Sequence, residues 1–445
     1  MGLNGPDPIA LECLLFREDP LAITRRRVVF ACANRRSHYY RQAPSPIIRA
    51  AVLVGDAERN RVSELQEIRS PGRYVAGPEG SRAFVPAPLP PSIQWTPSLV
   101  RALSDADRAV GELAGEGRRL PNPHLLIRPF LRREAVLSSR IEGTQATLGE
   151  LLAAEAGASV DRSPADLREV ANHVVALEYG VERLAILPLS LRLIREIHGH
   201  LMEGVRGGQA TPGELRRIQS WIGPPGSSPT NATYVPPPPG EMMEALDGLE
   251  RFLHDTSLPP LVQAALIHYQ FEAIHPFLDG NGRIGRLLII LFLLERKVLP
   301  SPLLYLSAFF EATRREYYAL LRGITEEGAW EAWIEYFLNG VARQTEDALS
   351  RASRINALLD RWRLAVAGSS TASELVPLLG ENPYWTVSGV SNRLGVAYTT
   401  AQRAVQRLVD ATVLTPLTDA KRNRVYCAQS VLEILEEPAR LVPES

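Results

Sequence analysis

Cysteine is scarce in this chain of 445 residues, which holds three: Cys13, Cys32 and Cys427. Their positions fit neither a disulfide framework nor a set of metal ligands, so a small protein stapled by disulfides or built around zinc is excluded. A reducing, cytoplasmic compartment is therefore expected.

Long apolar runs and an excess of charge are missing too. The longest strongly apolar run, Leu287 to Leu294, is far shorter than the ~18 residues of a membrane span, so we expect no membrane partner. The formal net charge is −1, which excludes a global electrostatic attraction to nucleic acid or membrane and leaves only local basic surfaces.

The length predicts several domains, and changes in composition divide the chain into four segments. Residues 1–75 stay unassigned, as a disordered arm, an accessory element or translation from too early a start codon. Residues 76–157 pass from proline-rich extended sequence into helices and form an N-terminal extension. Residues 158–348 are mostly amphipathic helix, without the alternation of strands and helices that a parallel sheet requires. Residues 349–445 form a separate C-terminal domain.

The most informative segment runs from His275 to Arg286, directly ahead of the apolar run. Gly280 and Gly282 allow backbone N–H groups to approach an anion, at the start of a helix whose N-terminus favours negative charge. Arg283 and Arg286 are three residues apart, so both guanidinium groups can face the same phosphate group. This combination predicts a site for a triphosphate.

Two further side chains in this segment add chemistry. Asp279 offers a hard oxygen ligand for Mg²⁺ that arrives with a nucleotide. His275 can act as a general base near neutral pH. The segment resembles the motif of Fic-domain proteins, His-x-Phe-x-Asp/Glu-Gly-Asn-Gly-Arg-x-x-Arg, at every defined position.

This resemblance implies an enzyme that transfers AMP from ATP to a hydroxyl group of a protein. His275 would deprotonate the target Ser, Thr or Tyr, Asp279 would hold Mg²⁺, and Asn281 with the loop amides would steady the α-phosphate. The two arginines would bind the β- and γ-phosphates, while Phe277 packs into the core and fixes the loop. The nucleotide-binding residues implied are Phe277, Asp279, Gly280, Asn281, Gly282, Arg283 and Arg286.

A second segment, Leu137 to Thr144, is similar to the inhibitory helix of this family. Ser138 and Glu142 are one helical turn apart, so both can point into one site, and Gly143 can end the helix. The resemblance implies that Glu142 binds Arg286 and obstructs the γ-phosphate of ATP. A solvated helix face is the alternative for so short a pattern, and its place ahead of the catalytic motif favours the inhibitory interpretation.

A third segment, Trp221 to Pro237, is predicted to form two short extended arms around a tip rich in turn residues. It resembles the Fic flap, which covers the site and binds the target by main-chain pairing through Thr233, Tyr234 and Val235. Pro224 and Pro225 depart from the usual pattern, and a proline-rich linker is the alternative. Tyr305 and the run Glu316–Tyr318 are expected to help shape the adenine pocket.

The C-terminal domain shows its own pattern. Residues 386–397 predict a short helix that ends at Gly395, and residues 398–400 offer hydroxyl caps to a second helix over 401–409. A strand pair is expected around 413–414 and 424–426.

This layout is similar to a winged helix-turn-helix, which predicts DNA binding through phosphate and base-edge contacts. Protein contacts or dimerisation are the alternative. The candidate DNA-binding residues are Gln402, Arg403, Gln406, Arg407, Lys421, Arg422 and Arg424.

We therefore expect a mainly α protein with a Fic-type helical core, a β-hairpin flap and a C-terminal winged helix-turn-helix domain. The expected activity is AMP transfer that uses ATP and Mg²⁺ and modifies target proteins and the chain itself. Two alternatives stay open: a DNA-binding regulator in which the Fic domain senses nucleotide, and AMP removal with Glu142 positioning a water. His275 favours transfer, because a protein that only holds ATP does not need this base. The target protein and the oligomeric state, including a homo-oligomer, are not determined.

Overall fold

The computed structural model describes residues 70–119, 124–158, 160, 163–205, 211–417 and 424–439. The predicted arm 1–69, together with Lys421 and Arg422 of the predicted DNA-binding set, lies outside these ranges. All described elements belong to one compact unit that begins at Arg61. No helix among them is long and apolar enough to span a membrane.

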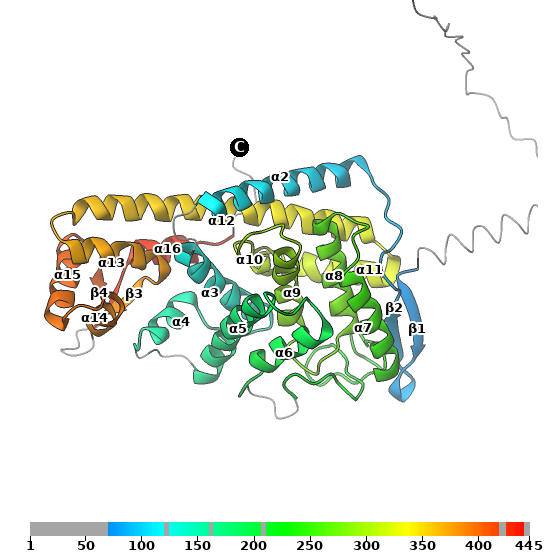
Figure 1. The fold of residues 1–445 in the computed structure, drawn as a ribbon. Coiled ribbons are helices and arrows are strands. Elements are labelled where there is room, and N and C mark those ends of the chain that lie inside the picture. The colour runs from blue at the N-terminus through cyan, green and yellow to red at the C-terminus, as the bar shows by residue number, and fades with distance from the viewer. Residues whose placement is uncertain are drawn as a thin grey trace, which may run out of the picture. The chain divides into compact units, whose positions relative to one another are not determined.

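The predicted class is observed, because helices dominate the described residues (Figure 1). The strands and short helix at the N-terminal side are β1 Gly72–Ala76, η1 Pro78–Gly80 and β2 Arg82–Pro86. The helices up to the flap are α2 Pro97–Arg119, α3 His124–Ile141, α4 Leu148–Glu155, α5 Pro164–Arg183 and α6 Leu191–Leu201. Those after it are α7 Pro239–Leu253, α8 Pro260–Ile274, α9 Asn281–Glu295, α10 Ser307–Ala312, α11 Arg314–Glu327 and α12 Trp330–Ala365.

Helices α8 and α9 form the centre of the core. Nearly every residue of both helices is buried, which is typical of helices that are apolar on all sides and packed on all sides. The two helices pack against each other, and α5, α6, α7 and α12 pack around them. The His275–Arg286 segment comprises the loop between α8 and α9 and the first residues of α9, so the candidate site is anchored in the most buried part of the protein.

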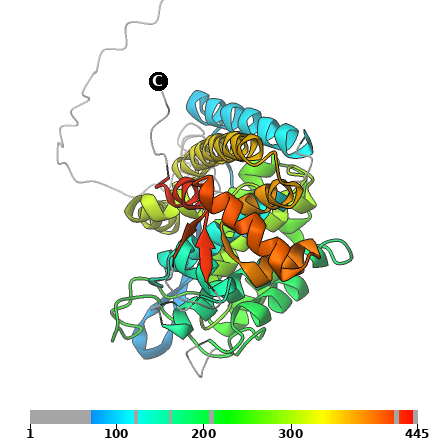
Figure 2. The same ribbon diagram turned by 90° about the vertical axis from the view of Figure 1, so that its left-hand side faces the viewer.

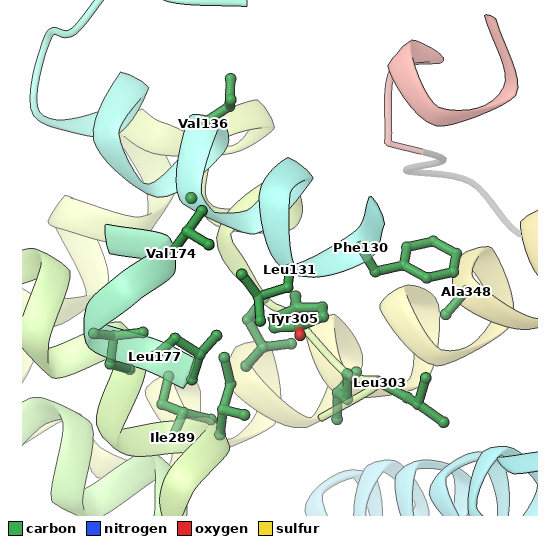
Figure 3. Close-up of a cluster of buried hydrophobic side chains, with 14 of the residues drawn as sticks. Phe130, Leu131, Val136, Val174, Leu177, Ile289, Leu303, Tyr305 and Ala348 are labelled. Carbon is green, nitrogen blue, oxygen red and sulfur yellow. The ribbon is translucent and has the colours of Figure 1, made fainter. Parts of the chain in front are cut away.

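Helix α3 packs its apolar side into the same core. Figure 3 shows Leu131 and Val136 of α3 beside Val174 and Leu177 of α5, while Phe130 points toward Ala348 of α12. Burial of a Leu or Val side chain contributes about 1.5–3 kcal/mol, so this face fixes α3 firmly against α5.

The sheet at the N-terminal side was not predicted. Strands β1 and β2 pair antiparallel from Gly72↔Pro86 to Ala76↔Arg82, so β1 crosses the predicted boundary at residue 75. The proline-rich composition hid strand β2, whose residues from Ala83 to Pro86 are all buried. A second predicted boundary, at residue 348, falls inside α12, which is continuous from the helical core into the C-terminal domain (Figure 1).

The C-terminal module comprises the described residues from 370 to 439. It contains α13 Ser370–Glu381, β3 Tyr384–Thr386, α14 Val387–Leu394, α15 Tyr398–Asp410, β4 Thr415–Pro416, β5 Val425–Cys427 and α16 Gln429–Glu436. The strands pair in the order β3-β5-β4, and Figure 2 shows this sheet beside the helices of the module.

The predicted helix end at Gly395 is confirmed, because Gly395 adopts the left-handed conformation with φ 66°. The expected hydroxyl caps were wrong: α15 begins at Tyr398, and no side chain caps it. The predicted strand pair is shifted by one or two residues, and β3 was missed. The order helix, turn, helix, hairpin is present, while the winged helix-turn-helix assignment stays a prediction.

Candidate functional site

His275 is held in an uncommon backbone conformation at the end of α8. Its φ of 49° and ψ of 62° lie in the left-handed region, which costs a residue with a side chain about 1–2 kcal/mol. Arg216 offsets this cost: its buried guanidinium donates hydrogen bonds to the carbonyls of His275, at 2.8 Å, and of Ile274 and Pro237. The neighbouring structure therefore imposes the direction of the imidazole.

The protonation state of His275 suits a base. Burial, reinforced by the Arg216 cation, lowers the pKa of His275 to about 4, so the imidazole is neutral at pH 7. Its Nδ1 atom has no hydrogen-bond partner within the described residues. A neutral imidazole can accept a proton from a bound hydroxyl group.

Two residues predicted to bind nucleotide build the loop. Phe277 is fully buried and stacks on the ring of His198, with ring centroids 3.7 Å apart, so it does not reach a nucleotide. The side chain of Asn281 accepts from the backbone N–H of Phe277 at 2.9 Å and donates to its carbonyl at 2.8 Å. Its amide therefore closes the loop, while its predicted contact with the α-phosphate stays a prediction.

His198 supports the loop from α6. Its Nδ1 accepts the backbone N–H of Gly213 at 2.9 Å, so Nε2 carries the proton and donates to the carbonyl of Asp279 at 3.0 Å. Gly280 beside it has φ 78°, and an added Cβ would lie 2.9 Å from the sulfur of Met202. Both conditions require glycine at this position.

The start of α9 is arranged to receive an anion. Gly280 is the N-cap residue, and no side chain caps the first turn of the helix. The Asp279 side chain is 54% exposed, and the nearest guanidinium nitrogen of Arg283 lies 3.6 Å from its Oδ1. Arg283 itself is buried, and its Nε and one terminal nitrogen make no hydrogen bond to a described residue. These unused donors fit an oxyanion.

Arg286 already has partners, all of them from α3 or the residue after it. Its guanidinium donates to the Ser138 hydroxyl at 2.9 Å, to the Ser138 carbonyl at 2.9 Å and to Glu142 Oε1 at 2.7 Å. Burial alone would raise the pKa of Glu142, but the Arg286 cation outweighs it and lowers that pKa. The structure thus joins Ser138 and Glu142 to Arg286, as the resemblance implies.

Glycine makes this contact sterically accessible. A Cβ at Gly282 would lie 2.3 Å from Glu142 Oε1, so any larger residue would displace the carboxylate. Gly143, which follows Glu142, has φ 103°, a conformation that favours glycine where the chain leaves α3.

Glu272 was missed by the sequence analysis. Its Oε1 is buried without a hydrogen-bond partner and occupies the space beside Gly285, 2.4 Å from where a Cβ would be. Burial raises the pKa of Glu272 to about 7, an effect that Arg286 opposes and Glu142 reinforces. Glu272 and Tyr318 line a cavity of about 380 Å³ together with flap residues, including Ile222 and Thr233.

The predicted flap hairpin is reduced to a single pair of hydrogen bonds, between Ile222 and Tyr234. Proline residues in both arms lack the N–H groups that a longer ladder needs. Thr233 is exposed, whereas Tyr234 donates its hydroxyl to the Ala273 carbonyl at 2.7 Å. Val235 is buried and accepts from the Phe84 backbone of β2 at 2.9 Å.

Comparison with known proteins agrees with this geometry. Residues 188–293 match the group described as Fic/DOC family, and residues 100–182 match Fic/DOC family N-terminal. Both the catalytic loop and the α3 segment therefore lie in matched regions.

Two relatives and one solved structure extend the comparison. The chain is 31% identical over 218 residues to "Protein adenylyltransferase Fic" of Drosophila virilis and 30% identical to that of Drosophila yakuba, covering 47% of this chain in each case. The match spans 40% and 39% of these relatives' own lengths. A Fic family protein from Desulfovibrio desulfuricans G20 shares the fold, with a TM-score of 0.52 at 21% identity over 76% of this chain and 98% of that one.

We predict that Glu272→Gln changes the pH dependence of stability. The pKa of Glu272 is about 7 in the folded protein against an ordinary 4.5, so the folded state binds this proton more tightly. The resulting stability is complete below pH 4.5 and is lost as the pH rises through 7. The midpoint temperature of thermal unfolding of Glu272→Gln should therefore rise relative to that of the parent protein between pH 5 and pH 8. The midpoint temperature of Glu244→Gln, on the exposed side of α7, should show no such rise. A difference in midpoint temperature between Glu272→Gln and the parent protein that is the same at pH 5 and pH 8 would contradict a buried, protonated carboxyl group at Glu272.

Proposed function

We propose that this protein transfers AMP from ATP to a Ser, Thr or Tyr hydroxyl of a target protein, and of itself, and that Glu142 restrains the reaction. The contact between Glu142 and Arg286, beside a neutral His275, carries the proposal. An acidic group paired with a buried arginine at an anion-binding helix start occupies the place that a phosphate group would take.

The chemistry follows from the positions of the side chains. The target hydroxyl loses its proton to His275 as its oxygen attacks the α-phosphorus of ATP. The bond from the α-phosphorus to the bridging oxygen breaks, and pyrophosphate leaves. Backbone N–H groups at the start of α9 and the guanidinium of Arg283 stabilise the charge that develops on the phosphate oxygens. Arg286 joins them once Glu142 withdraws.

Mg²⁺ fits this site as a companion of the nucleotide. No cluster of three or more His, Cys, Asp or Glu side chains that could hold a metal occurs among the described residues. Asp279 is a single, half-exposed carboxylate, which suits an ion that takes its other ligands from phosphates and water. Such an ion would neutralise phosphate charge as pyrophosphate leaves.

The cavity beside the flap is suited to the base of the nucleotide. Its volume of about 380 Å³ lies in the range of small-molecule sites, and aromatic and aliphatic side chains line much of it. Tyr318 is one of them, in agreement with its predicted role. The other predicted residues differ: Tyr317 is buried against His268, and Tyr305 is buried elsewhere in the core.

We also propose that the C-terminal module binds DNA. Gln402, Arg403, Gln406 and Arg407 are all exposed on one side of α15, the second helix of the helix-turn-helix pattern. Arginine and glutamine side chains on such a helix supply phosphate and base-edge contacts.

Replacement of His275 by alanine should lower AMP transfer by roughly 10²–10⁴-fold, because it removes the general base. ATP binding should change little, since the imidazole acts on the hydroxyl group. Self-labelling with α-³²P-ATP and calorimetric titration of ATP measure the two properties. His254→Ala, an exposed histidine at the end of α7, is the control. Parental labelling by the His275→Ala protein would disprove the assigned role.

Replacement of Glu142 by glycine should raise AMP transfer, because it frees Arg286 for the γ-phosphate. Coupling between two sites typically changes an affinity by roughly 5–150-fold, and we expect a rise of this order in the labelling rate. The double variant Glu142→Gly/Arg286→Ala should be as slow as Arg286→Ala alone, since the freed residue is then missing. Self-labelling of the four proteins tests this cycle, and equal rates for parent and Glu142→Gly would remove the inhibitory role.

Retention on a mixed-sequence DNA duplex should fall in Arg403→Ala/Arg407→Ala. Fewer phosphate contacts also predict a shallower dependence of binding on salt, by about one unit of slope per lost contact. Gel-shift titration at several salt concentrations measures both quantities, with Arg108→Ala on α2 as the control. Absence of DNA binding by the parent protein would contradict this proposal and favour the alternative that the module mediates protein contacts or dimerisation.

A further inference from the structure

Helix α3 makes contacts of two kinds at its two ends. At its C-terminal end, Ser138 and the following Glu142 hold Arg286. Earlier residues of the same helix contact the C-terminal module through α13 and α16 (Figure 1). From Phe130, the residue after the internal Pro129, α3 is continuous to Ile141, so a displacement at Arg133 moves the end that carries Ser138.

The first contact with the module is centred on Glu381, a buried carboxylate at the end of α13. Its Oε2 lies 3.5 Å from a terminal nitrogen of Arg128 on α3 and 3.7 Å from one of Arg393 on α14. One carboxylate thus joins α3 to the first helix of the helix-turn-helix pattern. Removal of either arginine leaves a buried charge with less compensation.

The second contact lies at the end of α16. Arg133 of α3 donates to the Glu437 carbonyl at 3.3 Å and lies 3.9 Å from Asp347 of α12. Arg351 fixes the same end by pairing with Asp347 and donating to the carbonyls of Ile434 and Glu437. Burial and the nearby Arg351 cation lower the pKa of Arg133 to about 10, so Arg133 stays charged at neutral pH.

The third contact reaches the chain just after Glu142. Glu436 of α16 accepts the backbone N–H of Gly149, in the first turn of α4, at 2.9 Å. The segment that carries Glu142 is therefore bounded on both sides by elements that the module contacts: α3 before it and α4 after it.

The interface with the module is incompletely packed. A cavity of about 410 Å³ lies within it, lined by residues of α3, α4, α10 and α16 that include Arg133, Arg140, Thr147 and Glu436. On the side of α3 that faces α5, Leu131 is buried beside Leu177 (Figure 3). The module is thus joined to α3 by the polar contacts above and by apolar residues of α13 and α16, such as Leu379 and Leu435, that belong to the same hydrophobic core.

We infer that the C-terminal module is a clamp on α3 that sets how firmly Glu142 occupies Arg286. This inference rests on the proposed AMP transfer and extends it by naming the element that controls the restraint. Detachment of the module loosens the position of Glu142, frees Arg286 for the γ-phosphate and raises the rate. Since α5 still holds α3, the rise is smaller than that produced by Glu142→Gly.

The test weakens the clamp in the full-length chain. Arg128→Ala/Arg133→Ala removes the two α3 side chains that reach the module, and self-labelling with α-³²P-ATP should rise by roughly 5-fold or more. Addition of Glu142→Gly to this double variant should give the rate of Glu142→Gly alone, because both changes act through the same contact. Hydrogen exchange of the amides of residues 134–143 should accelerate in the double variant.

Arg132→Ala is the matched control, because Arg132 pairs with Glu155 of α4, at 2.7 Å, and not with the module. It should leave labelling and exchange near the parental values. Glu381→Gln, which keeps the side-chain volume, is the second test should the double variant fold poorly, and it should raise labelling in the same direction.

The outcomes separate the clamp from the activity. Labelling that rises in Glu142→Gly but stays parental in both Arg128→Ala/Arg133→Ala and Glu381→Gln overturns the clamp and leaves the proposed function intact. An additive rise in the triple variant also overturns it, since the module would then act by another route. Absence of labelling in Glu142→Gly argues against the proposed AMP transfer, and exchange at residues 134–143 then decides whether the module still restrains α3.

Discussion

The arrangement of the site depends on the need of Arg286 for partners. A guanidinium at 2% exposure is strongly destabilising unless hydrogen bonds and a counter-charge compensate it. Ser138 of α3 and Glu142, the residue after α3, supply both. Glu142 lies 144 residues before Arg286 in the chain. The residue proposed to bind the γ-phosphate is therefore also the one that fixes α3, and substrate and helix compete for the same donors.

The catalytic loop and the flap differ in how firmly they are held. Arg216 fixes His275, and Asn281 closes the loop. The loop connects two helices, α8 and α9, whose residues are nearly all buried. The flap has one pair of backbone hydrogen bonds and an exposed Thr233. A preorganised loop suits the chemistry on the phosphate, while a loosely paired flap leaves backbone groups for an extended target segment.

Helix α12 connects the catalytic core to the C-terminal module without an interruption. Near its start, the Trp333 indole donates to the Ala265 carbonyl of α8 at 2.9 Å. Farther along, Arg351 binds the end of α16. Helix α2 packs along α12. The module contacts both α12 and α3 (Figure 1). The module is therefore joined to the catalytic core along two helices, α3 and α12.

The sequence by itself determined the helical class and the anion-binding loop at the start of an apolar helix, whereas the pairing of Glu142 with Arg286 was implied only by the family resemblance. These features are local: glycine, histidine and arginine at fixed spacing carry them. Only the tertiary structure decided the roles of Arg216, His198 and Glu272, because the partners of these side chains lie on segments far away in the sequence. It also showed how Phe277 and Asn281 build the loop, since burial and backbone hydrogen bonding depend on how α6 packs against the loop. The contact of α3 with the C-terminal module belongs to the same class, because no pattern in either segment encodes which surface it meets.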